Sequence, residues 1–233
     1  MDFNKHKFFM LQILKDIYSD LELSNYLGFK GGTALVFFHK LPRFSVDLDF
    51  NLLIVDKEKE TEIYQKVRNI LLKYGKIDDE AQKFFGIIFV LNYGKGERKL
   101  KIEISNCQYD NHYEVKTFMG INMLVMSLAD MFAHKLCAVL DRTELTNRDI
   151  FDCWFFMENR TPVNKNLVES RMEMPFADYL QKCVDTLNNL SDKNLLNGIG
   201  DLIDEKMKQF VRTKLYNETV ILLQFYKEFP ILS

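Results

Sequence analysis

Two closely spaced carboxylates, Asp47 and Asp49, follow a glycine pair, Gly31 and Gly32, within one segment of the chain. On a β-strand, residues two apart project from the same face, so both aspartates share one face while their apolar neighbours occupy the other. Like charges at this spacing repel unless a cation lies between them, and carboxylate oxygens suit Mg²⁺ or Mn²⁺. A glycine-rich turn leading into a helix presents backbone N–H groups to a phosphate. These features predict a site for a metal–nucleotide complex and the chemistry of nucleotidyl transfer.

Each feature alone has a simpler interpretation. An Asp-x-Asp pair by itself is typical of a solvated strand end, and a glycine pair by itself is typical of a tight turn. Their occurrence in one segment, with the aspartates on an apolar strand, favours the functional interpretation.

Composition is that of a globular enzyme: 233 residues, 47% hydrophobic and 27% charged. The net charge of −2 gives no global attraction to nucleic acid, so an RNA partner would need a local basic patch. No apolar run has the length of a membrane span and no signal-peptide pattern is seen, so no membrane partner is expected. Four scattered cysteines predict free thiols and a cytoplasmic location, and four scattered histidines predict no zinc site.

Apolar periodicity predicts an α+β protein in two regions. Residues 1–121 form an α/β catalytic core, and residues 122–233 form a helical region. In the core, helices are expected over 8–23, 33–39 and 58–74, a strand over 46–54, and a hairpin of strands over 84–93 and 98–105. In the second region, helices are expected over 123–142, 147–158, 164–188 and 200–228.

Residues 31–35 (GGTAL) and 43–50 (RFSVDLDF) resemble the first motif of the AbiEii/AbiGii-type nucleotidyltransferase toxins, a family within the DNA polymerase beta nucleotidyltransferase superfamily. Fourteen residues separate the second glycine from the first aspartate, slightly more than is usual in the superfamily. The resemblance covers most of the chain. It implies a polymerase-beta-like mixed sheet with flanking helices, followed by a mostly helical C-terminal region. It also implies nucleotide binding by Gly31, Gly32, Thr33, Arg43 and Ser45, with Asp47 and Asp49 as catalytic metal ligands.

A third carboxylate, Glu103, alternates with apolar residues on the second strand of the predicted hairpin and shares a face with Lys101. Charges of this kind are equally typical of a solvated edge strand. Polymerase-beta-like enzymes carry a third acidic residue on a neighbouring strand, where the toxin family usually has Lys-Ile-Asp rather than Lys-Ile-Glu. The resemblance implies that Glu103 is a third metal ligand or the base for the incoming hydroxyl, and that Lys101 contacts a phosphate.

Lys135 lies among apolar residues of the predicted helix 123–142, with Arg142 aligned on the same side. Such a lysine either extends its ammonium group to solvent or directs it into a cleft. Residues 133–142 (AHKLCAVLDR) resemble the third family motif. This resemblance implies that Lys135 contacts nucleotide phosphates or helps to activate the acceptor, and it places Arg142 among the nucleotide-binding residues.

The fourth motif of the family resembles residues 147–152 (NRDIFD), which implies a required aspartate. Asp149 is the first choice for this residue, with a catalytic role, and Asp152 is the second, counted among the nucleotide-binding residues. Thr146 with Asp149 also fits a helix N-cap pattern, so a purely structural role for this acid remains open. If the motif is functional, the helical region contributes Lys135 and Asp149 to the cleft that holds the metal.

The resemblance implies an Mg²⁺-dependent enzyme that moves a nucleoside monophosphate from a nucleoside triphosphate to a hydroxyl group. The acceptor would be RNA, with the tRNA 3′ end preferred, or a protein hydroxyl. The protein would be the toxin of a bacterial toxin–antitoxin or phage-defence system, with a cognate antitoxin encoded nearby that need not contact it. Two alternatives stay open: transfer to a small molecule such as an antibiotic, and a non-catalytic nucleotide-binding module.

Overall fold

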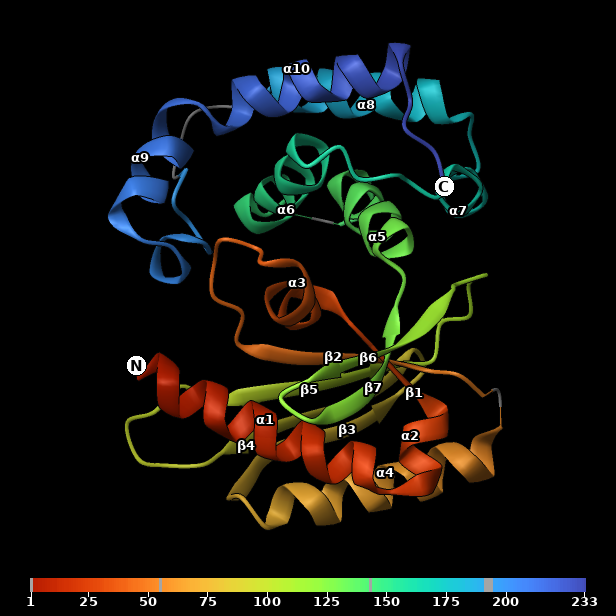
Figure 1. Ribbon diagram of the computed structural model, residues 1–233, viewed down its shortest axis with the longest axis vertical. Coiled ribbons are helices and arrows are strands. Elements are labelled where there is room, and N and C mark those ends of the chain that lie inside the picture. The colour runs from red at the N-terminus through yellow and green to blue at the C-terminus, as the bar shows by residue number, and fades with distance from the viewer. Residues whose placement is uncertain (1, 55, 143, 191–194) are drawn as a thin grey trace. The chain divides into compact units, whose positions relative to one another are not determined.

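The computed structural model describes residues 2–54, 56–142, 144–190 and 195–233. The chain divides into two compact units, Met1–Met126 and Ser127–Ser233. The first contains a seven-stranded mixed sheet with flanking helices, and the second is helical (Figure 1). The predicted α+β fold is thereby confirmed. None of the helices in the described ranges is both long and apolar enough to cross a membrane.

The sheet of the first unit has the strand order β3-β4-β5-β2-β1-β7-β6. Its strands are β1 (Leu27–Lys30), β2 (Asp47–Leu52), β3 (Lys76–Lys83), β4 (Gly86–Asn92), β5 (Leu100–Ser105), β6 (Tyr113–Phe118) and β7 (Ile121–Met126). The pairs β2–β5 and β1–β7 are parallel, and the other neighbours are antiparallel. The aspartate strand therefore lies near the centre of the sheet.

Among the described residues of the first unit, three of the four helices cover the apolar face of its sheet, and the fourth lies on the other face (Figure 1). The helices of the first unit are α1 (Phe3–Ser19), α2 (Leu21–Tyr26), α3 (Gly31–His39) and α4 (Lys57–Leu72). From α1, the Tyr18 ring lies 6.5 Å from that of Phe50, and from α4, the Tyr64 ring stacks at 5.0 Å on Phe89. Both phenylalanines are fully buried. Helix α3 lies on the opposite side of the sheet (Figure 1), and its first residue, Gly31, lies against the Asp49 carboxylate.

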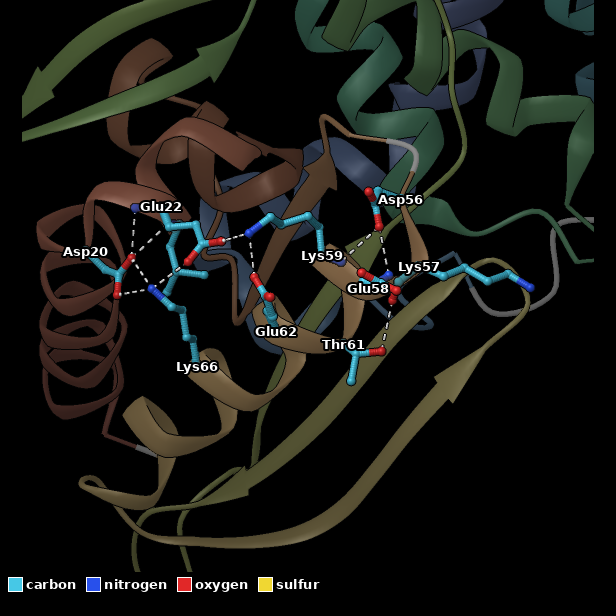
Figure 2. Close-up of polar contacts among 10 residues, drawn as sticks. Asp20, Glu22, Asp56, Lys57, Glu58, Lys59, Thr61, Glu62 and Lys66 are labelled. Atoms are coloured by element: carbon cyan, nitrogen blue, oxygen red, sulfur yellow. Dashed lines mark hydrogen bonds and ion pairs between the residues drawn. The ribbon is translucent and has the colours of Figure 1, made fainter.

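A network of ion pairs joins the start of α4 to α2 (Figure 2). Lys59 contacts Glu22 at 2.9 Å, and Lys66 contacts Glu22 at 2.8 Å and Asp20 at 3.1 Å. Hydrogen bonds from Lys66 and then Lys59 lower the pKa of Glu22 to about 2. Asp56 caps α4 by accepting hydrogen bonds from two backbone N–H groups of its first turn. Exposed ion pairs contribute little singly, so the Asp56 cap sets the start of α4 and the ion pairs join α4 to α2.

The second unit is built around stacked aromatic rings. Its helices are α5 (Leu128–Asp141), α6 (Asn147–Glu158), α7 (Lys165–Met172), α8 (Phe176–Asn188), the 3₁₀ helix η1 (Gly200–Leu202), α9 (Glu205–Thr213) and α10 (Leu215–Glu228). Phe132 of α5 stacks on Phe156 of α6 at 4.8 Å and meets the edge of Tyr226 of α10 at 5.7 Å. All three rings are buried, so they hold the three helices together.

Several predicted helices are interrupted where the sequence seemed continuous. The helix expected over 8–23 breaks at Asp20, whose carboxylate caps α2. The helix expected over 164–188 is α7 and α8, because Glu173 adopts φ 53° and Pro175 cannot continue a helix. The segment 200–228 contains η1, α9 and α10 rather than one helix.

The strands were predicted less completely than the helices. Strand β2 and the antiparallel hairpin of β4 and β5 are confirmed. Strands β1, β3, β6 and β7 were not predicted. The helix expected from residue 123 begins at Leu128 instead, since Ser127 caps it and the apolar run before it forms β7.

Candidate functional site

The two aspartates and the third acidic residue lie side by side on two parallel strands. Asp47 is opposite Lys101, and Asp49 is opposite Glu103. Residues paired in this way project from the same face of a sheet, so all four side chains share one face. They are partly exposed, whereas Leu48 on the other face is fully buried. The arrangement gathers three carboxylates and one ammonium group at the middle of the sheet.

Lys101 acts as the counter-ion of this acidic face. Its ammonium group makes a short ion pair with Glu103. Burial acts to lower the pKa of Lys101, but the hydrogen bond and charge of Glu103, followed by the charges of Asp49 and Asp47, raise it overall. The lysine therefore interacts electrostatically with all three carboxylates.

Both glycines of the motif are required by close packing. Gly31 adopts φ +78°, and a Cβ atom there would overlap the Asp49 carboxylate. A Cβ atom on Gly32 would lie 2.7 Å from the Ser45 hydroxyl and 3.0 Å from the Arg43 guanidinium group. The absence of side chains thus lets the start of α3 approach Asp49, Ser45 and Arg43 closely.

The third residue of the glycine motif has a different environment. Thr33 is fully buried, and its hydroxyl donates a 2.5 Å hydrogen bond to the Asp47 carbonyl. Within the part of the chain that the structure describes, the N-cap residue of α3 is Lys30, and its side chain makes no capping hydrogen bond to the helix. The first backbone N–H groups of a helix have no intrahelical acceptor, so they are suited to an anion. A phosphate contact by Thr33 stays a prediction, for which its backbone N–H is better suited than its hydroxyl.

In the second unit, the residues of the third and fourth motifs form one network. The Lys135 ammonium group lies 2.8 Å from Asp152 and 3.4 Å from Asp149. Arg142 lies 3.2 Å from Asp149, and the Thr146 hydroxyl donates to the same carboxylate at 2.6 Å. Both aspartates are buried. Lys135 is therefore directed into a group of acids rather than toward open solvent.

Asp149 takes part in two kinds of contact, and its functional role stays a prediction. Thr146 is the N-cap of α6 and accepts a hydrogen bond from the Asp149 backbone N–H, as a structural cap would require. The Asp149 carboxylate also contacts Lys135 and Arg142. Asp47, Asp49 and Glu103 belong to the first unit, and Lys135 and Asp149 to the second. The common cleft expected for these five residues stays a prediction.

One residue beside the aspartates was missed by sequence reasoning. His6 of α1 is buried, its Nε2 lies 2.9 Å from the Val46 carbonyl, and its Nδ1 lies 2.6 Å from the Tyr93 hydroxyl. Burial lowers its pKa against the opposing effects of the Val46 carbonyl and the Asp47 charge. One pattern in the sequence could have identified His6. It lies four residues before the buried Met10, so this polar ring is on the apolar face of α1.

The chemistry of the carboxylate face fits a hard divalent cation. Asp47, Asp49 and Glu103 offer only oxygen donors, which Mg²⁺ and Mn²⁺ prefer. Among the residues that the structure describes, no group of three or more histidine, cysteine, aspartate or glutamate side chains is already gathered as a metal site. Mg²⁺ in enzymes commonly keeps several water ligands and also binds substrate phosphates, so two protein carboxylates are enough to hold it once the substrate is bound.

Comparisons with known proteins identify the fold and the family of the chain. A comparison with curated protein sequences gives no match. Among solved structures, JHP933 from Helicobacter pylori matches with TM-score 0.62 and 20% identity over 98% of this chain and 93% of that chain. A second Helicobacter pylori structure gives TM-score 0.63 and 20% identity, covering 97% and 95% of the two chains. MenT4, a nucleotidyltransferase toxin from Mycobacterium tuberculosis, gives TM-score 0.53 and 16% identity, covering 94% and 85%.

At these identities the structures show a shared fold, whereas the sequence profile is decisive for the family. The profile of the nucleotidyl transferase AbiEii toxins of type IV toxin–antitoxin systems matches residues 12–220, which is most of the chain. The matched range contains the glycine turn, all three carboxylates of the sheet and the Lys135 network. The chain is therefore a nucleotidyltransferase that belongs to the AbiEii toxin family.

Proposed function

We propose that this nucleotidyltransferase moves a nucleoside monophosphate from a nucleoside triphosphate to the 3′-terminal hydroxyl of a tRNA, as the toxin of a toxin–antitoxin pair. The observation that carries the proposal is the register of β2 and β5, which aligns Asp49 with Glu103 beside the glycine turn. Family membership supports the toxin role and a cognate antitoxin, which need not bind the toxin directly.

The nucleotide would bind between the glycine turn and the acidic face. The first backbone N–H groups of α3 and the hydroxyl of Ser45 would donate hydrogen bonds to the phosphate oxygens, and Arg43 would add positive charge. Asp47 and Asp49 would hold Mg²⁺ or Mn²⁺, with Glu103 as a third ligand or as the base. The bound cation would supply neutralisation of the triphosphate charge.

Transfer would proceed by displacement at the α-phosphorus. The acceptor oxygen forms a bond to this phosphorus while the bond to the bridging oxygen of the β-phosphate breaks, and pyrophosphate leaves. The proton of the acceptor hydroxyl passes to a carboxylate oxygen, for which Glu103 is the candidate. Lys101 would then exchange its contact with Glu103 for a phosphate oxygen. Catalysis would rest on positioning and charge stabilisation rather than on a covalent enzyme intermediate.

The second unit would supply two further cations. Lys135 and Arg142 are held in place by buried carboxylates of Asp149 and Asp152. A cation fixed by such contacts loses little side-chain entropy when it meets a phosphate. In this scheme the two cations contact the nucleotide, and the two aspartates orient them.

An RNA acceptor is supported by basic residues on and before β5. Lys95, Arg98 and Lys99 precede the strand that carries Lys101. Lys99 also contacts Asp78 at 3.0 Å, so part of its charge is neutralised within the protein. A local group of cations of this kind suits a phosphate backbone despite the overall charge of −2.

The test is to incubate the protein with each α-³²P-labelled nucleoside triphosphate, Mg²⁺ and total bacterial RNA, and to locate the label. Label on the tRNA 3′ end, with release of pyrophosphate, is expected for the wild type. Asp49→Asn should remove it, whereas Asp79→Asn, a matched change at an exposed position of β3, should not. Label on protein, or on an added aminoglycoside with none on RNA, would overturn the RNA acceptor. Full activity of Asp49→Asn would overturn the site.

A further inference from the structure

We propose that His6 and Thr33 are positioning residues that fix the main chain of Asp47 from its two sides. The inference rests on the proposed role of Asp47 as a cation ligand, and it concerns what holds that ligand in place. His6 hydrogen-bonds to the carbonyl before Asp47, at Val46, and Thr33 donates to the carbonyl of Asp47 itself. Both side chains are buried, at 1% and 0% exposure.

This support is needed because the sheet does not extend to Asp47 on the β1 side. Strand β1 pairs with β2 from Leu27 opposite Leu52 as far as Lys30 opposite Asp49. The next residue after Lys30 begins α3, so Asp47 has a strand neighbour only in β5. Buried carbonyl groups need hydrogen-bond donors, and at this point two side chains provide them in place of a strand.

The donor atom of His6 is fixed by a third residue. The Tyr93 hydroxyl lies 2.6 Å from Nδ1, and Nε2 faces the Val46 carbonyl at 2.9 Å. A carbonyl can only accept, so Nε2 carries the proton and Nδ1 accepts from Tyr93. The imidazole is thereby fully satisfied as a neutral ring, which suits its buried position.

The same side of α1 makes two more contacts, one with the segment before Asp47 and one with Thr33. Phe3 stacks on Phe44 at 3.9 Å, and the Met10 sulfur lies 3.9 Å from the Thr33 hydroxyl. Phe3, His6 and Met10 all precede residue 12, where the match to the family profile begins. The first turns of α1 are therefore a support for the aspartate segment that the family motifs do not include.

Loss of such support should weaken cation binding more than it weakens the fold. Groups that hold a metal ligand without touching the metal typically change metal affinity roughly 10- to 100-fold when they are removed. His6→Met removes the donor at similar length, whereas His6→Gln keeps an N–H group near the position of Nε2. Thr33→Val removes the hydroxyl at equal volume, whereas Thr33→Ser keeps it.

The experiment measures Mn²⁺ binding to the full chain without nucleotide, by the electron paramagnetic resonance signal of free Mn²⁺, together with the thermal unfolding midpoint. His6→Met and Thr33→Val should each weaken Mn²⁺ binding by about 10-fold or more, and His6→Gln and Thr33→Ser should recover most of the loss. Unchanged Mn²⁺ affinity in folded His6→Met and Thr33→Val would overturn the inference. If His6→Met does not fold, the Thr33 pair decides alone.

Asp47→Asn separates this inference from the function on which it rests. If Asp47→Asn leaves Mn²⁺ affinity unchanged, the carboxylate is not a ligand and the proposed site itself fails. If Asp47→Asn weakens binding but His6→Met and Thr33→Val do not, the site stands and only the positioning role is wrong.

Discussion

Replacing Lys135 with methionine should destabilise the second unit strongly, because it removes the ammonium group that lies between two buried carboxylates. Asp152 is fully buried and 2.8 Å from the Lys135 nitrogen, and the lysine side chain is itself only 19% exposed. Removing one member of such a buried pair costs about 3–5 kcal/mol. Asp149 keeps Arg142 and Thr146 as partners, so we assign most of this loss to Asp152.

A double-mutant cycle isolates the interaction between Lys135 and Asp152. Asp152→Asn removes the charge left uncompensated by Lys135→Met, so the double variant should be more stable than Lys135→Met alone by about 1–3 kcal/mol. Urea unfolding can be followed through Trp154, the only tryptophan, which lies on α6 near Asp152 and donates to Glu218 at 3.2 Å. Its fluorescence reports directly on this unit.

A small effect would refute the reasoning. If Lys135→Met lowers the free energy of unfolding by less than about 1 kcal/mol, the pair adds no net stability and desolvation cancels its attraction. The measurement also bears on function, since lost transfer activity in Lys135→Met indicates a role in chemistry only where the variant is still folded. Activity should therefore be assayed without urea, at a temperature well below the thermal unfolding midpoint of the variant.

Three further predictions concern the first unit. Gly96→Ala, at φ +80° with open space around it, should cost about 1–2 kcal/mol of unfolding free energy. Gly31→Ala, at φ +78°, should lower the unfolding free energy more than Gly96→Ala and should abolish transfer, because its Cβ atom overlaps the Asp49 carboxylate. Equal losses for the two variants in urea unfolding would contradict this crowding. Burial lowers the pKa of His39 from 6.5 to about 4, so the unfolded chain takes up the proton first and stability should fall as pH drops from 6.5 to about 4. His39→Gln should flatten this part of the stability–pH curve, and an unchanged slope would show that His39 is not its source. Lys101→Met should tighten Mn²⁺ binding several-fold without nucleotide, because a competing cation is removed; weaker Mn²⁺ binding by paramagnetic resonance would contradict that competition.

The sequence predicted the strand of the aspartates because period-two alternation is visible there. Val46, Leu48 and Phe50 alternate with polar residues, and the structure buries all three apolar side chains. It did not predict β7, because the short apolar run of residues 123–126 fits a buried strand and a helix start equally well. Strand β1 is only four residues long and contains Gly28, whose missing side chain makes room for the Tyr113 ring.

The candidate site was predicted unevenly for similar reasons. The shared face of Asp47, Asp49 and Glu103 follows from local alternation together with the pairing of two parallel strands. The contact of Lys135 with Asp149 and Asp152 joins two helices and was not predicted, although resemblance to a family singled out these residues. His6 lies forty residues before Val46, and no local pattern links a helical histidine to a distant carbonyl.

The strand that was hardest to predict also protects the sheet. Strand β3 lies at one edge of the sheet, and five of its eight residues are charged. Its sequence therefore lacks the alternation of apolar and polar residues that predicts a strand. An exposed edge offers unpaired N–H and C=O groups to a strand of another molecule, and charged side chains oppose that contact. The charges of β3 thus act against edge-to-edge aggregation. At high concentration of this toxin, the charged edge would therefore favour dispersed molecules over edge-to-edge stacks.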